Sequence, residues 1–227
     1  MTNRILFDRS FWALSVICLT QAGCSSDRDP GGAAASTPPI PTPAPGVQLI
    51  LGFDTSASWK PHLPASARIG ARLSSHLDPN RDQLTAFRID RSTWEFYDSR
   101  PPDGATACLR ILWRELSKPP AVEGTWPATF YQRAVERSES SQQSVVVAFF
   151  TDGDNDNPAQ VPHWRAAGAA LAANPRVAAV AIYGVSASNW ASVRSLLGPL
   201  GDRLLLYSES DMDPSVLMQR IDSLVHH

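Results

Sequence analysis

Cysteine is scarce in this chain, and an excess of charge of either sign is lacking. Three cysteines in 227 residues are too few for a scaffold held together by disulfides. The 20 Lys and Arg residues nearly balance the 22 Asp and Glu residues, which leaves no electrostatic case for nucleic-acid binding. No uncharged apolar run reaches the roughly 18 residues that a spanning helix needs, which argues against a polytopic membrane protein. None of the five histidines forms a short metal-ligand spacing with another ligand, which disfavours a zinc site.

The N-terminus has the pattern of an export signal, which we place at residues 1–23. An apolar run at 11–19 follows a weakly positive start and is too short to span a bilayer. The Ala-Gly-Cys sequence at 22–24 resembles the lipobox of bacterial lipoproteins, in which the cysteine is lipidated, although Gln21 stands where lipoboxes prefer leucine. We therefore expect Cys24 to carry the lipid. The alternative is an ordinary cleaved signal in which this cysteine is incidental.

Residues 24–46 are expected to form a tether. Six prolines fall between Pro30 and Pro45, and proline fixes φ and lacks the N–H that a helix interior or a strand ladder needs. The segment should therefore be extended, at about 3 Å per residue, and should hold a domain well above a membrane surface. Ser25 replaces the aspartate associated with inner-membrane retention, so we expect a lipid-anchored position in the cell envelope, at the outer rather than the inner membrane.

The remaining residues, 47–227, form one expected domain in which buried strands alternate with helices. Near-continuous apolar runs at 47–53, 145–150 and 177–183 are typical of strands covered on both faces. A hairpin is predicted at 83–97. This alternation predicts an α/β fold with a doubly wound, mostly parallel sheet, one antiparallel edge strand and helices on both faces. Helices are predicted at 65–77, 107–116, 130–137, 164–173, 190–197 and 214–225, and a last strand at 203–207.

Oxygen-bearing side chains follow two of the predicted strands. Asp54, Ser56 and Ser58 follow the first strand, and Asp152 follows the strand at 145–150. Ligands bind beyond the carboxyl ends of strands in open α/β sheets, so these residues, outside the predicted core, are expected to form one site. Hard oxygen donors with few carboxylates suit Mg²⁺ or Mn²⁺ better than zinc. The alternative is that these side chains only cap the helices that follow them.

Two short sequences together resemble a known family. The D-x-S-x-S sequence at 54–58 and the T-D-G sequence at 151–153 resemble a von Willebrand factor type A (VWA) domain with a metal ion-dependent adhesion site. The resemblance covers nearly all of the expected domain and implies the Rossmann-like fold of that family. It also implies a threonine from an intervening loop, for which Thr125 matches the position and Thr129 competes. The implied cofactor is Mg²⁺, with Mn²⁺ or Ca²⁺ as alternatives.

The same resemblance implies a role for each residue of the site. Ser56 and Ser58 ligate the ion directly, and Thr125 binds it directly or through water. Asp54 and Asp152 act largely through water, so that the ion stays electrophilic and keeps an open position for an Asp or Glu carboxylate of a partner protein. The expected function is therefore adhesion-type protein binding without catalysis. A metal-dependent envelope hydrolase of the same α/β class and a scaffold with a purely structural ion are the alternatives.

Other interpretations of these residues are weaker. The acidic run that begins at Asp152 lacks the glycine and the glutamate that an EF-hand loop needs at its sixth and twelfth positions, so this type of calcium site is excluded. Neither serine has the flanking glycines of a serine-hydrolase elbow. Asp154 and Asp156 either add negative charge to the rim of the site or cap the next helix. Cys108 is expected to be a small buried hydrophobe and not a nucleophile.

Overall fold

The computed structural model describes residues 46–120 and 122–225. The expected signal peptide, Cys24 and nearly all of the expected tether lie outside these ranges, so the expectations about them stay predictions. Within the described ranges, no helix is both long and apolar enough to cross a membrane.

The described strands are β1 (Val47–Asp54), β2 (Gln83–Ile89), β3 (Thr93–Ser99), β4 (Ser144–Phe150), β5 (Val177–Val185) and β6 (Leu204–Ser208). They form one sheet in the order β3-β2-β1-β4-β5-β6. Neighbouring strands pair in parallel except β2 and β3, which are antiparallel. The mostly parallel sheet and its one antiparallel edge strand are therefore confirmed.

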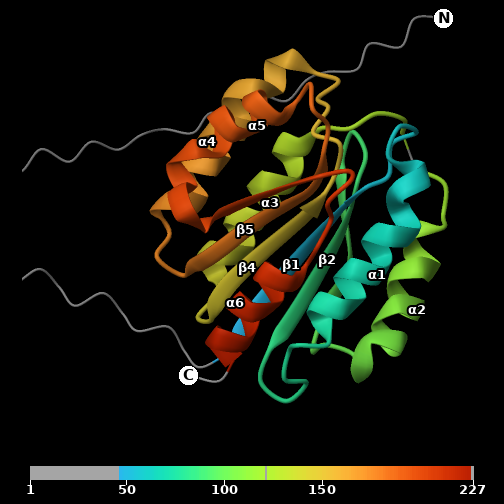
Figure 1. Cartoon of the computed structure of the whole chain (residues 1–227), viewed down its shortest axis with the longest axis vertical. Coiled ribbons are helices and arrows are strands. Elements are labelled where there is room, and N and C mark those ends of the chain that lie inside the picture. Colours follow the sequence, from blue (N-terminus) through green and yellow to red (C-terminus); the bar gives the residue numbers. More distant parts are fainter. Residues whose placement is uncertain (1–45, 121, 226–227) are drawn as a thin grey trace, which may run out of the picture. The chain divides into compact units, whose positions relative to one another are not determined.

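The described α-helices are α1 (Leu63–Ser74), α2 (Gly104–Leu116), α3 (Pro127–Ser140), α4 (Val161–Ala173), α5 (Trp190–Leu197) and α6 (Ser215–Val225). Short 3₁₀ helices are η1 (Lys60–His62), η2 (Pro158–Gln160) and η3 (Gly198–Arg203). Buried side chains of α1, α2 and α6 pack on one face of the sheet, and those of α3, α4 and α5 pack on the other (Figure 1). This is the predicted doubly wound arrangement.

The central strand β1 is buried along its whole length because helices cover both of its sides. Alternate side chains of a strand point to opposite faces, so Leu51 and Phe53 belong to the core beneath α1 and α2, whereas Ile50 belongs to the core beneath α3. Gly52 also faces α3, where an added Cβ atom would lie 2.5 Å from the ring of Phe130. This close approach holds the start of α3, and the loop before it, against the end of β1.

The predicted elements are all present, with shifts at several helix ends. α1 runs from residue 63 to 74 instead of 65 to 77. α2 begins at Gly104 instead of residue 107, and α3 begins at Pro127 instead of residue 130. A proline in the first turn sacrifices no helical hydrogen bond, so Pro64 and Pro127 are compatible with these early starts.

Candidate metal site

The candidate site lies at the carboxyl ends of β1 and β4, which are parallel neighbours in the sheet. The chain leaves β1 for α1 on one face and leaves β4 for α4 on the other, and such a divergence is where open α/β sheets bind ligands. Phe53 pairs with Phe150, which places Asp54 beside Thr151 at this edge. The two polar clusters predicted from the sequence are therefore brought together.

Asp54 is the centre of a hydrogen-bond cluster that joins three loops. Its Oδ1 atom accepts from the backbone N of Ser56 at 2.8 Å and from Oγ1 of Thr125 at 2.8 Å. Its Oδ2 atom accepts from Oγ1 of Thr151 at 2.9 Å. Asp54 is completely buried and Asp152 is 6% exposed, which corrects the expectation that both acids lie outside the core. Burial, with a smaller contribution from the charge of Asp152, raises its pKa to about 6 although the hydrogen bonds lower it.

Ser56 and Ser58 lie in the turn that follows β1. The backbone N of Lys60 donates to the carbonyl of Ser56 at 3.0 Å, and the Oγ atoms of the two serines are 3.1 Å apart. The capping residues of η1 and α1 are Trp59 and His62, and neither makes a side-chain capping bond. The alternative that the serines cap these helices is therefore wrong, and their hydroxyls instead form a pair at the sheet edge.

Of the two candidate threonines, the structure brings Thr125 to Asp54. The hydroxyl of Thr125 donates to that carboxylate, and the residue is buried. The hydroxyl of Thr129 donates instead to the carbonyl of Trp126 at 2.8 Å and lies 2.7 Å from the hydroxyl of Thr93. Thr129 is therefore engaged at the first turn of α3 and at the start of β3.

Acidic residues organise the loop after β4. The Oδ1 atom of Asp152 accepts from the backbone N of Asp154 at 3.0 Å, which closes a turn inside the loop and does not cap a helix. Asp156 accepts from the backbone N of Thr125 at 2.5 Å, and its own backbone N donates to the carbonyl of Thr125 at 3.3 Å. The following helix, η2, is capped by Asn157. Asp156 therefore binds the backbone of the loop that contains Thr125, and Asn157 rather than Asp156 caps η2.

Three residues outside the expected ligand set support the site. Thr151 donates to Asp54, and the T-D-G pattern already included that position. Gly124 has a φ of +107°, and an added Cβ atom would lie 2.6 Å from Oδ2 of Asp156; a glycine directly before the loop threonine is the sequence signal for this close approach. The carbonyl of Asp90, in the turn between β2 and β3, accepts from the backbone N–H that follows the loop threonine. No sequence pattern links those two distant positions.

No protein-family model and no curated protein matches the sequence. Several solved structures are similar in fold. A von Willebrand factor type A protein from Catenulispora acidiphila has a TM-score of 0.53 at 16% identity, over 79% of this chain and 42% of that one. An aerotolerance-related membrane protein from Bacteroides fragilis has a TM-score of 0.56 at 15% identity, over 80% and 99% of the two chains. Proximal thread matrix protein 1 from the mussel byssus, with a zinc-occupied MIDAS motif, has a TM-score of 0.55 at 16% identity, over 80% and 46%.

The chain has the von Willebrand factor type A fold. At identities of 15 to 16%, these likenesses concern the fold alone. What the candidate site can bind therefore depends on its own side chains.

Those side chains fit the divalent ion that a VWA fold implies. The expected ligand set has two carboxylates and three hydroxyls, which are hard oxygen donors of the kind that Mg²⁺ takes. Among the residues that the structure describes, no group of three or more His, Cys, Asp or Glu side chains could hold a metal ion, so the expected set depends on its hydroxyl oxygens as well as its two carboxylates. The charge of Asp152 contributes to the raised pKa of Asp54, and a bound cation would relieve this repulsion. The residues of the set are Asp54, Ser56, Ser58, Thr125 and Asp152.

Proposed function

We propose that this protein is a divalent-metal-dependent, adhesion-type protein-binding module that a lipid holds in the cell envelope. The observation that carries the proposal is the convergence of three loops on Asp54, through hydrogen bonds from Ser56, Thr125 and Thr151. A second carboxylate, Asp152, lies close enough to raise the pKa of the first. Two like charges at one buried edge favour the binding of a cation.

Each proposed ligand has a definable part in this site. Thr125 donates its hydroxyl proton to Asp54, so the lone pairs of its oxygen are free for a cation. Ser56 and Ser58 offer two further hydroxyl oxygens. Asp54 and Asp152 supply negative charge and would contact the ion largely through water molecules. A bound Mg²⁺, or Mn²⁺ or Ca²⁺ in its place, would act as a Lewis acid that can accept a partner's carboxylate.

The proposed partner presents an Asp or Glu carboxylate at its surface. Two exposed acids at the rim, Asp154 and Asp156, repel such a group when no ion is bound, so the ion reverses the sign of the local field. Arg91 is exposed on the turn between β2 and β3, and its Nε atom lies 3.0 Å from where a Cβ atom of Gly124 would be. This guanidinium can attract the partner's carboxylate to the rim.

Two structural neighbours support parts of the proposal. The mussel protein has a zinc-occupied MIDAS motif, which supports a divalent ion here, and the Bacteroides fragilis protein is a membrane protein, which supports an envelope location. The hydroxyls of Ser56 and Ser58 bond to each other, which argues against a serine nucleophile that a histidine activates. A metal-dependent envelope hydrolase and a scaffold with a structural ion are the alternatives.

Calorimetric titration with Mg²⁺ and with Mn²⁺ tests the ion site. Asp54→Asn should lower the affinity by roughly tenfold or more, because it removes a full negative charge. Ser56→Ala should lower it less, because a hydroxyl contributes only a dipole. Asp202→Asn, which changes an exposed aspartate in η3, is the matched control and should bind like the wild type. Undiminished affinity in Asp54→Asn would remove the assignment.

Capture of a partner from envelope extract tests the second half of the proposal. The immobilised chain should retain a partner in Mg²⁺ and release it in chelator. Moderate salt should only weaken capture, because rim charges are screened over about 8–10 Å whereas a metal–carboxylate bond is short-ranged. Thr125→Ala should lower capture more than ion affinity, and Thr129→Ala should change neither. Capture that persists unchanged in chelator would mean that the partner uses another surface.

A further inference from the structure

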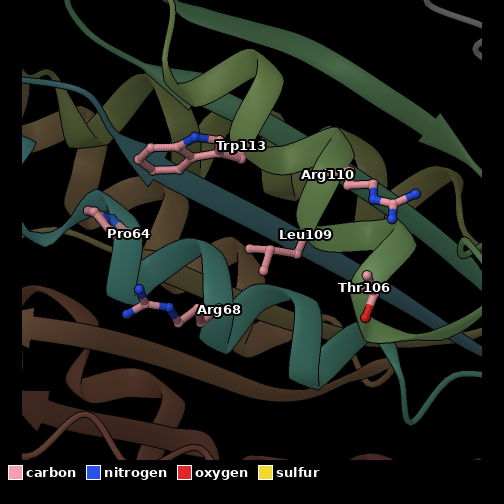
Figure 2. Close-up of a pocket in the computed structure, with 6 residues that line it drawn as sticks. All are labelled: Pro64, Arg68, Thr106, Leu109, Arg110 and Trp113. Atoms are coloured by element: carbon pink, nitrogen blue, oxygen red, sulfur yellow. The ribbon is translucent and has the colours of Figure 1, made fainter.

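A groove of about 360 Å³ lies between α1 and α2. Trp113 and Leu109 of α2 lie across from Pro64 and Arg68 of α1 in Figure 2, and the lining continues along α2. None of the proposed metal ligands lines this groove, so it is a separate surface. The lining residues are Pro64, Arg68, Thr106, Leu109, Arg110 and Trp113.

The centre of the groove is apolar and open to solvent. Trp113 is 45% exposed, and Leu109 beside it is only partly buried against the core. Removing apolar surface from water stabilises a complex by about 25 cal/mol per Å². Tryptophan is also enriched among the residues that contribute most to protein–protein binding. An exposed indole in a groove therefore favours a ligand that covers it with apolar side chains.

The two helices that form the groove carry an excess of positive charge. Together α1 and α2 contain four arginines and a single acid, Glu115, which is paired with Arg114 and Lys118. Arg68 and Arg110 line the groove, and neither has a hydrogen-bond or ion-pair partner within the described residues. The whole chain has a formal net charge of −2, so this positive surface does not follow from overall composition.

We propose that this groove binds an acidic amphipathic helix of a partner protein. α1 has 12 residues and α2 has 13, so each is about 18–20 Å long and can accompany about three turns of a third helix. Apolar side chains at i, i+3 and i+4 spacing cover Trp113 and Leu109, as in other helix-in-groove complexes. Carboxylates beside them pair with Arg68 and Arg110, because the planar guanidinium bonds a carboxylate at two points.

Two other ligand classes fit this groove less well. Affinity for nucleic acid comes largely from many Lys and Arg contacts to phosphates, and two arginines beside an exposed tryptophan provide few of them. The headgroup surface of a bilayer has no ridge that would enter a groove lined by Leu109 and Trp113. An acidic amphipathic helix can cover the apolar centre of the groove with apolar side chains and can pair its carboxylates with Arg68 and Arg110.

Fluorescence anisotropy with a labelled twelve-residue peptide tests the proposal. The peptide has leucine and phenylalanine at helical spacing and glutamate at its other positions, and the experiment uses the whole chain in chelator, so that the proposed metal site takes no part. We expect saturable binding that falls by roughly tenfold or more in the Arg68→Glu/Arg110→Glu variant and in Trp113→Ala. Arg165→Glu changes an exposed arginine of α4, on the opposite face of the sheet, and should bind the peptide like the wild type.

Several results would overturn the proposal. Absence of saturable binding, or equal affinity in the charge-reversed variant and the wild type, would show that the groove does not recognise an acidic helix. Competition by phosphatidylglycerol vesicles, but not by phosphatidylcholine vesicles, together with failure of the peptide, would assign the groove to an anionic lipid surface. Self-association that is lost in Trp113→Ala would assign it to a second copy of the chain. Because Arg68 and Arg110 are exposed and lie outside the core, the charge-reversed variant should keep the wild-type melting temperature. The test therefore remains valid even if Trp113→Ala unfolds.

Discussion

The carboxyl group of Asp54 combines complete burial with a proposed role that needs negative charge. In the folded protein without metal its pKa rises from the ordinary 3.8 to about 6, chiefly through burial. The folded state therefore holds this proton more tightly than the unfolded chain does. The contribution of Asp54 to stability is complete below about pH 4 and declines as the pH rises to about 6, where the folded protein must keep a buried charge.

Asp54→Asn should therefore stabilise the metal-free protein near neutral pH. An asparagine can still accept from Ser56 and Thr125, and the hydroxyl of Thr151 can turn to accept from its amide. We expect the free energy of unfolding in chelator at about pH 7.5 to rise by about 1–3 kcal/mol, and the decline between about pH 4 and 6 to flatten. Urea denaturation at a series of pH values measures both effects.

With the ion present, we expect Asp54→Asn to be less stable than the wild type. In saturating Mg²⁺ the wild type gains stability from the bound ion, and the variant does not. Asp202→Asn is again the control, and its pH profile should follow the wild type. A variant that is less stable than the wild type in chelator would show that the hydrogen bonds to the carboxylate outweigh the cost of burying its charge.

At the scale of single elements, the loop at 55–59, which contains the proposed ligands Ser56 and Ser58 (the proposed metal loop), lies against strand β5. Trp59 follows Ser58 directly and is completely buried. Gly184 of β5 has a φ of +97°, and an added Cβ atom there would lie 1.9 Å from the indole of Trp59. The absence of a side chain at this position therefore allows the tryptophan, and the loop that it anchors, to pack onto the sheet.

Gly184→Ala should displace Trp59 and with it the proposed metal loop. We expect a loss of about 2–4 kcal/mol in the free energy of unfolding, from overpacking together with the strain of a positive φ. Affinity for Mg²⁺ should fall as well, because Ser58 moves with its neighbour. Gly201→Ala is the matched control, since Gly201 has a φ of +55° but an added Cβ atom would meet nothing within 4 Å. Equal losses of stability, with Mg²⁺ affinity unchanged in both variants, would contradict the role of Trp59.

Strands were more predictable from the sequence than helix starts. β1, β4 and β5 are covered on both faces, so each is marked in the sequence by a near-continuous apolar run with few competing signals. The start of α2 is different, because Gly104 has a φ of +78° and no apolar periodicity marks it. The pattern therefore detects this helix only from residue 107.

The site was predictable in its strand-end residues and less so in its loops. Asp54 and Asp152 each follow a buried strand, and parallel neighbours bring such ends together. The sequence could not decide between the two loop threonines, because the choice depends on Asp156 accepting from the backbone of Thr125. That contact joins segments 31 positions apart in the chain. The burial of Asp54 was missed for the same reason, since it results from loops that pack over it.

At the scale of the whole domain, the start of the domain and the proposed metal site lie at opposite ends of strand β1. β1 begins at Val47 and ends at Asp54, and its eight residues span about 25 Å. The expected tether, residues 24–46, joins the domain where β1 begins, at the end of the strand opposite the proposed metal site.

A substitution can test whether Cys24 is the lipid anchor. Cys24→Ser should move the protein from the membrane fraction to the soluble fraction and should abolish metabolic labelling with fatty acid. A single acyl chain binds a membrane only marginally, so we expect more than one chain on the wild-type cysteine. Cys108→Ala is the control, because this thiol is buried, as expected from the sequence, and its removal should leave both labelling and membrane attachment unchanged. A mature wild-type protein that begins at another residue and carries no lipid would favour the ordinary cleaved signal, and the domain would then have to reach its partner without an anchor.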